Sequence, residues 1–287
     1  MPIISIIIVT YNSDSYISEC LESIFYYNDL EESDIEVIIV DNSLVTSNYL
    51  RTKVNTFPNS KLISNPQNGG FGQGNNIGAS IAQGKILLFL NPDTKFVEPL
   101  FKEVIRKFRN YPQIGVVGCK LIDEMGKPCF TYGYFPEKRN IIRDLIDKFL
   151  FQKIGYIPKK NIYPWGADLF IRRSDFINAG GFDENIFLCH EEPDICTRLK
   201  PNKTAIISKK IIHFEGHSTK ISEIKYDSWG ESLIYYLKKY RYNISRTLRN
   251  LSFVFYMYIL IGKLIRKDIG ILKLYYAKIK ELKIKYD

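Results

Sequence analysis

The chain has 287 residues, enough for one large α/β domain with an appendage or for two modest domains. Its 45% apolar and 25% charged residues are typical of a soluble globular protein. The net charge of +9 comes with no zinc-finger spacing, basic zipper or aromatic RNA-binding signature, so we expect no nucleic-acid partner.

The positive charge is concentrated at the end of the chain. Residues 226–287 hold 13 basic and 5 acidic residues, a net charge of +8, and are rich in aromatic and aliphatic side chains. This composition suits an anionic membrane surface better than a folded core. A self-packing or dimerising helical region is the alternative interpretation, and it leaves a homo-oligomer open.

The cysteines and the apolar runs indicate the compartment. Five scattered cysteines without a CxxC pair are typical of reduced thiols in a cytosolic protein. The chain starts with a strand-like run instead of a basic segment, so we expect no signal peptide. The longest apolar stretch, Leu251–Gly262, is too short to span a bilayer. We therefore predict a cytoplasmic protein. Peripheral attachment to the inner face of the cell membrane stays open.

The first hundred residues alternate between strands and helices. The expected elements are a strand over Ile3–Thr10, a helix over Ser15–Tyr27, strands over Glu36–Val40 and Lys61–Ser64, a loop over Asn65–Gly74, a helix over Asn75–Gln83 and a strand over Ile86–Leu90. Such alternation predicts an α/β fold with a parallel, doubly wound sheet.

The second half is less regular. The expected elements are a helix over Phe101–Phe108, a strand over Gly115–Leu121, a helix over Ile141–Phe151, a strand-like run over Trp165–Ile171, a helix start over Glu191–Leu199, a strand-like run over Ala205–Phe214 and helices from Asp227 onward. The sequence shows no internal repeat.

Polar residues follow the ends of the expected strands, at Asp41, Asn68–Gly70 and Asp93. Ligands of open α/β sheets bind outside the carboxyl ends of the strands, so this pattern predicts a nucleotide-type site. No GxGxxG follows the first strand and no GxxxxGK[ST] is present, which disfavours a standard dinucleotide fold and a P-loop enzyme.

Asp93 lies directly after a buried strand, in the tripeptide Asn91-Pro92-Asp93. A carboxylate there can hold Mg²⁺ or Mn²⁺ against a diphosphate. Asn-Pro-Asp is also a common turn, and this interpretation would prevail without a second carboxylate cluster.

That second cluster is Glu191-Glu192-Pro193-Asp194. Three carboxylates in four residues repel one another, so a purely structural role is costly unless they are solvated or paired. A helix N-terminus, with proline and acids in its first turn, is the simple structural interpretation. A helix start beside a ligand crevice can also present a general base, and we interpret the cluster in this way.

Two of the three histidines, His213 and His217, lie four residues apart after a strand-like run. The ordinary interpretation of such a pair is that both are surface or core histidines without a function. One of them could instead complete the coordination of a metal ion held by Asp93.

Read together, these segments resemble glycosyltransferase family 2, and within it the bacterial rhamnosyltransferase-like enzymes of surface polysaccharide assembly. The matching segments, which cover roughly residues 3–220 in the right order, are SIIIVTYN (5–12), VIIVDNS (37–43), residues 65–78 with their Gly-Phe-Gly core, LLFLNPDT (87–94), Trp165-Gly166-Ala167, GGFDE (180–184), the acidic cluster and HFEGHS (213–218).

The resemblance implies a GT-A fold, with a Rossmann-like and mostly parallel central sheet flanked by helices. Residues 1–225 would form the glycosyltransferase domain, with a nucleotide-sugar-binding half over 1–95 and an acceptor half over 96–225. Residues 226–287 would form a helical basic extension.

The resemblance also implies a site, residue by residue. Donor contacts would come from Thr10, Tyr11, Asn12, Asp41, Asn68, Gly69, Gly70 and Asp93. Acceptor contacts would come from Trp165, Gly166, Ala167 and Asp168. The metal ligands would be Asp93 and His213, binding Mg²⁺ or Mn²⁺. The base would be Glu192, with Glu191 as the other candidate.

Two positions depart from the family pattern. Glu192 stands where the family usually has an aspartate base, and its side chain is one methylene longer. Asn91 replaces the first acid of the family's DxD-type metal motif, which lowers the expected metal affinity. Rhamnosyltransferase-like members share this Asn-Pro-Asp form.

The resemblance implies an inverting transfer of a sugar from a nucleotide diphosphate donor, such as dTDP-rhamnose, to a lipid-linked surface glycan. Two alternatives stay open. A nucleotidyltransferase would need a Gly-rich, basic signature near the first strand, which Tyr11-Asn12-Ser13 does not supply. A catalytically inactive, nucleotide-sugar-binding scaffold of a polysaccharide assembly complex is suggested by Glu192 in place of aspartate.

Overall fold

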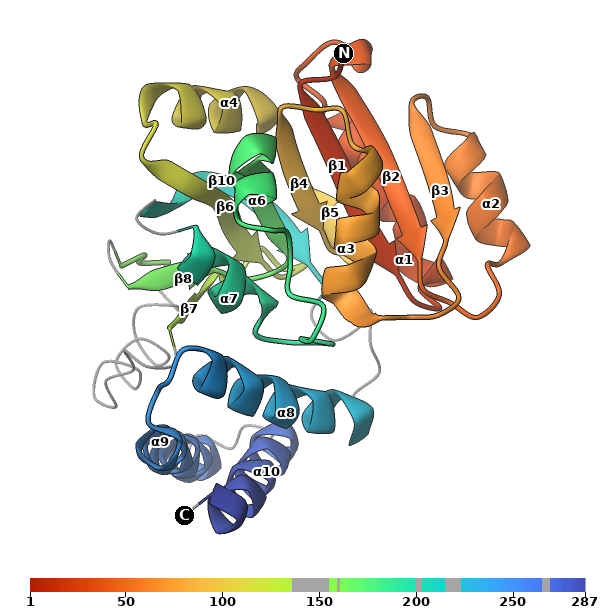
Figure 1. Cartoon of the computed structure of the whole chain (residues 1–287). Helices are drawn as coiled ribbons and strands as arrows, with labels where there is room; N and C mark the ends of the chain where they lie inside the picture. Colours follow the sequence, from red (N-terminus) through yellow and green to blue (C-terminus); the bar gives the residue numbers. More distant parts are fainter. Residues whose placement is uncertain (136–154, 159–160, 200–202, 215–222, 265–268, 287) are drawn as a thin grey trace.

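Figure 1 shows the computed structural model of the chain, which describes all residues except 136–154, 159–160, 200–202, 215–222, 265–268 and 287. The expected helix over 141–151 and His217 lie outside the described residues. A central sheet carries helices on both of its faces, and three further helices lie together at the C-terminal end (Figure 1).

Within the described residues, eight strands form one sheet in the order β3-β2-β1-β4-β9-β6-β10-β5. Their bounds are β1 (Ile4–Thr10), β2 (Ile35–Asp41), β3 (Ser60–Ser64), β4 (Ile86–Leu90), β5 (Thr94–Phe96), β6 (Ile114–Ile122), β9 (Asp168–Arg172) and β10 (Lys203–His213). A small antiparallel pair, β7 (Tyr132–Tyr134) and β8 (Ile162–Pro164), forms a second sheet, and β8 contacts β10 through the hydrogen bond from the Thr204 hydroxyl to the Ile162 carbonyl (2.8 Å).

The parallel part of the sheet is confirmed for its first half, because β1 pairs in parallel with β2 and β4, and β2 with β3. The second half is mixed. β9 runs antiparallel to β4 and β6, and β5 runs antiparallel to β10. A short buried apolar run has the same composition in either direction, so the sequence could not show these reversals.

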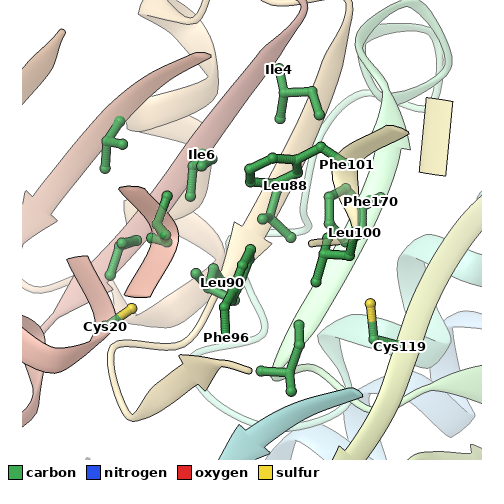
Figure 2. Packing of buried hydrophobic residues seen from close by; sticks show 14 of the residues in the cluster. Ile4, Ile6, Cys20, Leu88, Leu90, Phe96, Leu100, Phe101, Cys119 and Phe170 are labelled. Atoms are coloured by element: carbon green, nitrogen blue, oxygen red, sulfur yellow. The ribbon is translucent and has the colours of Figure 1, made fainter. Parts of the chain in front are cut away.

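The helices of the sheet are α1 (Asp14–Tyr26), α2 (Asn48–Asn55), α3 (Gly70–Ile81), α4 (Phe101–Asn110), α6 (Arg173–Asn178) and α7 (Glu191–Arg198), with a 3₁₀ turn η1 (Glu32–Asp34). Helices α1, α2 and α4 pack on one face, and α3, α6 and α7 pack on the other. Figure 2 shows the first face, where Cys20 of α1 and Phe101 of α4 lie over Leu88 and Leu90 of β4. Sequence patterns had not predicted α2, α6, β5, β7 or β8.

Helix α3 begins at Gly70, five residues before the expected start. Its glycine-rich first turns have low helix propensity, which predicted a loop. The glycines let the helix approach the sheet closely, because a Cβ at Gly74 or Gly78 would press on Val9 or Ile7 of β1. Tertiary packing therefore overrides local propensity at this position.

The basic C-terminal residues form a packed unit of three helices, α8 (Glu223–Lys239), α9 (Ile244–Leu264) and α10 (Gly270–Tyr286). Leu233, Tyr236 and Leu248 are buried in a core that all three helices share. The expectation that this composition suits a membrane better than a folded core is therefore wrong for these side chains. Phe253 and Tyr256 of α9 are 48% and 46% exposed. None of the described helices is long and apolar enough to cross a membrane.

Candidate active site

The carboxyl ends of β1 and β2 lie in register, with Thr10 opposite Asp41. Asp41 is buried, and its Oδ1 accepts hydrogen bonds from the Thr10 hydroxyl (3.0 Å) and the Ser43 hydroxyl (2.6 Å). Its Oδ2 is buried without a hydrogen-bond partner among the described residues. A buried carboxylate oxygen without a donor is costly, so this atom is suited to accept a hydrogen bond from a ligand.

The loop over residues 68–70 closes this edge of the sheet. The Asn42 side chain donates to the Gly70 carbonyl (3.0 Å), and the Gly69 amide donates to the Gln73 side chain (2.9 Å). Gly70 has φ +89°, and a Cβ there would overlap the carbonyl oxygen of Phe187. Only glycine satisfies both requirements, and it brings the loop against the segment that precedes the acidic cluster.

Tyr11 and Asn12 continue the chain beyond β1, and both are exposed. The backbone amide of Asn12 donates to the Ser43 hydroxyl (2.8 Å), and Asn12 itself has φ +51°. Ser43 thus holds Asp41 and Asn12 together, a role that the sequence had not singled out. Its position two residues after the strand's aspartate is the signal that could have found it.

Asp93 and His213 are brought together by the antiparallel pairing of β5 with β10. Asp93 Oδ1 lies 3.5 Å from His213 Nε2, and both side chains are buried. The Phe214 amide donates to the Asp93 carbonyl (2.9 Å), which fixes the pair. The described part of the chain has no group of three or more potential metal ligands. The two groups are nonetheless close enough for one cation to contact both, and a diphosphate would supply further oxygens.

The acidic cluster forms the first turn of α7. It follows Cys189 and His190, which both have left-handed backbone conformations (φ +68° and +72°). Two successive residues of this kind are strained, and such strain is concentrated at functional sites. The strained backbone turns the chain sharply into the helix that begins at Glu191.

The two glutamates differ in exposure. Glu191 is 3% exposed, and its Oε1 has no hydrogen-bond partner among the described residues. Burial, followed by the charge of Glu192, raises the pKa of Glu191 well above its usual value. Glu192 is partly exposed, and burial also raises its pKa, against the lowering effect of backbone hydrogen bonds that include one from Gly166. A raised pKa suits a carboxylate that must take up a proton near neutral pH.

The short segment between β8 and β9 contacts both α7 and the Asn91–Asp93 turn. A Cβ on Gly166 would overlap the carboxylate of Glu192, so the side chain of Glu192 lies directly on this glycine. The next residue, Ala167, accepts a hydrogen bond from the Asn91 amide (3.0 Å). Glu192 and the Asn91–Asp93 turn therefore flank the same two residues.

The four expected acceptor residues differ in how much surface they present. Trp165 is 37% exposed and packs against Phe130, with ring centroids 5.9 Å apart. Gly166 and Ala167 are buried. Asp168 is 1% exposed, and its Oδ2 accepts a hydrogen bond from the Cys119 amide (2.6 Å). Among the four, Trp165 offers a side-chain face to an acceptor, and the acceptor role of all four stays a prediction.

The third acid of the cluster, Asp194, is fully buried and paired. Arg198 contacts its Oδ2 through Nε (2.9 Å) and Nη2 (2.6 Å), and Lys239 contacts its Oδ1 (2.6 Å). The i, i+4 spacing of Asp194 and Arg198 was visible in the sequence. Lys239, which lies 45 residues away, could not be inferred from spacing.

The mixed central sheet, with Asp41 and Asp93 at its strand ends, has the GT-A fold of solved glycosyltransferases. The chain belongs to glycosyl transferase family 2, whose sequence model matches residues 5–166.

Two relatives are rhamnosyltransferases. Rhamnosyltransferase WbbL of Escherichia coli is 26% identical over 270 residues, which are 88% of this chain and 98% of that protein. The N-acetylglucosaminyl-diphospho-decaprenol L-rhamnosyltransferase of Mycobacterium tuberculosis is 23% identical over 76% of this chain and 78% of its own length.

Two solved structures share the fold. S. aureus TarS 1-349 in complex with UDP-GlcNAc matches with a TM-score of 0.55 and 19% identity, over 83% of this chain and 67% of TarS. The mannosyltransferase PcManGT of Pyrobaculum calidifontis, in complex with GDP-Man and Mn²⁺, matches with a TM-score of 0.54 and 17% identity, over 96% and 70% of the two chains.

Proposed function

We propose that this glycosyltransferase moves a sugar from a nucleotide diphosphate donor to a lipid-linked surface glycan, with inversion at the anomeric carbon. We infer dTDP-rhamnose as the first donor to test, since two relatives are named rhamnosyltransferases. A lipid-linked acceptor is supported by the name of the mycobacterial relative, which acts on a diphospho-decaprenol substrate.

One observation carries this proposal. Gly166 and Ala167 lie between the carboxylate of Glu192 and the turn that ends at Asp93. A donor diphosphate held beside Asp93 would therefore have its sugar close to Glu192. The Oδ2 of Asp41, which has no hydrogen-bond partner in the described part of the chain, supports a nucleoside pocket at the neighbouring strand end, lined by Thr10 and closed by the loop over 68–70.

The proposed reaction is a single displacement. The acceptor hydroxyl oxygen bonds to the anomeric carbon from one side, while the bond from that carbon to the diphosphate oxygen breaks on the other. The hydroxyl proton passes to Glu192, and the nucleoside diphosphate leaves with the bonding electron pair. We assign the base to Glu192 over Glu191, because Glu192 is the more exposed of the two.

Asp93 and His213 would hold a divalent cation, for which Mg²⁺ and Mn²⁺ are the candidates. When bound, such a cation would neutralise negative charge on the diphosphate. The Mn²⁺ in the complex of the mannosyltransferase PcManGT supports this assignment for the fold, and the 3.5 Å separation of Asp93 Oδ1 and His213 Nε2 supports it for this chain.

We also propose that the C-terminal helices rest on the cytoplasmic face of the membrane, where a lipid-linked acceptor would be found. The support is the net charge of +8 over residues 226–287 together with the exposed apolar side chains of α9 and α10. These side chains are Phe253, Tyr256, Ile271 and Leu274. A domain division after residue 225 and a homo-oligomer stay predictions.

Donor hydrolysis tests the site without knowledge of the acceptor. Wild type is incubated with a panel of nucleotide sugars and Mn²⁺, beside Glu192→Gln and Asp93→Ala, and nucleotide release is measured. We expect both variants to lose activity, on the order of 100-fold or more, because one lacks the base and the other a ligand of the diphosphate site. Unchanged turnover in both variants would contradict the proposed site. No turnover by wild type with any donor would favour the scaffold alternative.

A further inference from the structure

The last residue of α8 reaches into the segment that carries the proposed base. Lys239 Nζ lies 2.6 Å from Asp183 Oδ2 and 2.6 Å from Asp194 Oδ1. The side chains of Asp194, Asp183 and Lys239 are 0%, 13% and 24% exposed, so most of this bridge is shielded from water. Shielded ion pairs are screened less than surface pairs and contribute more to fixing geometry.

Asp183 belongs to a turn that is also attached to the donor-side helix α3. The Phe182 amide donates to Asn76 Oδ1 (2.8 Å), and Asn76 Nδ2 donates to the Phe182 carbonyl (2.9 Å). Partial burial opposes ionisation of Asp183, but the hydrogen bonds from Lys239, Asn185 and Tyr235 outweigh it and hold its pKa well below the usual value. Asp183 is therefore a charged anchor at the start of the segment over residues 183–194, which carries Glu192 (the base segment).

Asp194 anchors the other end of the base segment, two residues after Glu192. Its Oδ2 is occupied by Arg198, and its Oδ1 accepts from Lys239 and from the Tyr240 hydroxyl (2.9 Å). Lys239 is the last residue of α8, and Tyr240 directly follows it. Without Lys239, the described contacts of Oδ1 reduce to Tyr240 alone.

The strained backbone lies between these two anchors. Cys189 and His190 adopt left-handed conformations, and the surrounding contacts must hold them there. Some of these contacts also come from α8, because Ser232 donates to the Leu188 carbonyl (3.0 Å) and the His190 ring lies 5.9 Å from that of Trp229. The position of Glu192 therefore depends on contacts from α8, which belongs to the C-terminal unit of three helices.

We propose that Lys239 is a positioning residue for glycosyl transfer. By bridging Asp183 and Asp194 it fixes the distance between the two ends of the base segment. This distance in turn sets the direction in which α7 presents Glu192. The inference rests on the proposed function, with Glu192 as base. It makes the C-terminal helices a part of the catalytic unit, whether or not they also contact a membrane.

The test compares Lys239→Met with Lys238→Met by donor hydrolysis in solution, without lipid. Lys238 is the neighbouring lysine, is exposed, lies 5.1 Å from the centre of the Tyr286 ring, and forms no ion pair with a described residue. We expect Lys239→Met to lose kcat roughly 10- to 100-fold with an unchanged KM for the donor, because a misplaced base slows the chemical step alone. Lys239→Arg, whose guanidinium can reach two carboxylates, should recover most of the activity.

Equal kcat values for Lys239→Met and Lys238→Met would overturn the inference. If Lys239→Met does not fold, Asp183→Asn decides, because it removes one anchor and leaves Asp194 paired with Arg198. We expect that variant to stay folded, with a somewhat lower melting temperature, and to lose kcat at a temperature where it is fully folded, and full activity would overturn the inference.

Hydrogen exchange separates this inference from the proposed function. Amides of residues 183–194 should exchange faster in Lys239→Met than in Lys238→Met, even if wild type turns over no nucleotide sugar. A wild type without turnover contradicts the proposed function alone, whereas unchanged exchange contradicts the bridge.

Discussion

The buried carboxylates of this site differ in whether their oxygens have hydrogen-bond or ion-pair partners. Asp194 is paired with two cationic side chains, and Asp41 has three hydrogen bonds on one oxygen and, among the described residues, none on the other. Glu191 has an oxygen without a described partner. A buried acid with all its oxygens paired is structural, whereas one with an unpaired oxygen is suited to a ligand or a proton. The structure therefore separates a paired anchor from candidate functional groups within one acidic cluster.

Asp168 leads to a prediction about pH. Burial raises the pKa of Asp168 to about 8, against the lowering effect of its hydrogen bonds with Cys119. The folded state therefore keeps this proton up to about pH 8, while the unfolded chain releases it at about pH 4. Because the unfolded state binds fewer protons in this window, the contribution of Asp168 to stability falls as pH rises, by up to about 1.4 kcal/mol per pH unit.

Asp168→Asn cannot ionise, so its stability relative to wild type should increase between pH 5 and pH 8. Thermal unfolding of both proteins at several pH values measures this difference. Parallel curves over the whole range would contradict the raised pKa.

At the scale of single elements, α3 shows how packing sets a helix against its own propensity. The helix contains Gly70, Gly72, Gly74 and Gly78, and a Cβ at Gly78 would come within 2.5 Å of a methyl carbon of Ile7. Ile7 is fully buried and β-branched, so it has little freedom to move. The closeness of α3 to β1 places the donor loop at the strand ends.

We predict that Gly78→Ala destabilises the protein by about 1–3 kcal/mol, although alanine is the better helix former. Urea unfolding monitored by circular dichroism gives the free energy of unfolding. Ser80→Ala, at an exposed position of the same helix, is the matched control and should change it by less than about 0.5 kcal/mol. A stabilised Gly78→Ala variant would show that the helix can move away from the sheet at little cost.

At the scale of the whole molecule, the C-terminal helices have two different surfaces. One surface is buried, through the shared core around Tyr236 and the contacts of α8 with Asp183 and Asp194. The other carries Phe253 and Tyr256, which lie three residues apart on one side of α9. Deleting α9 and α10 would expose the shared core, so substitutions at the exposed positions are the sharper test of membrane binding.

We predict that Phe253→Ser combined with Tyr256→Ser weakens binding to anionic liposomes at least about tenfold, because two exposed aromatic side chains can no longer enter the interface. Donor hydrolysis should be unchanged. Liposome co-sedimentation measures the affinity, and Ile177→Ser, which removes an apolar side chain 56% exposed on α6, is the control. Equal binding by the double variant and the control would refute the membrane surface.

The sequence by itself determined the α/β class, the GT-A resemblance, and the strand ends that carry Thr10, Asp41 and Asp93. These features are local, because a buried apolar run followed by polar residues records both a strand and its ligand edge. The start of α7 and the strand that ends at His213 were likewise predicted from short patterns.

Only the tertiary structure decided the direction of β9 and β5, the start of α3 at Gly70, and the folded core of the basic C-terminal residues. It also decided that Asp93 lies beside His213, that Glu192 lies on Gly166, and that Lys239 joins Asp183 to Asp194. Each of these depends on contacts between residues far apart in the chain. Composition and spacing describe neighbours in sequence, whereas the environment of a buried charge is set by neighbours in space.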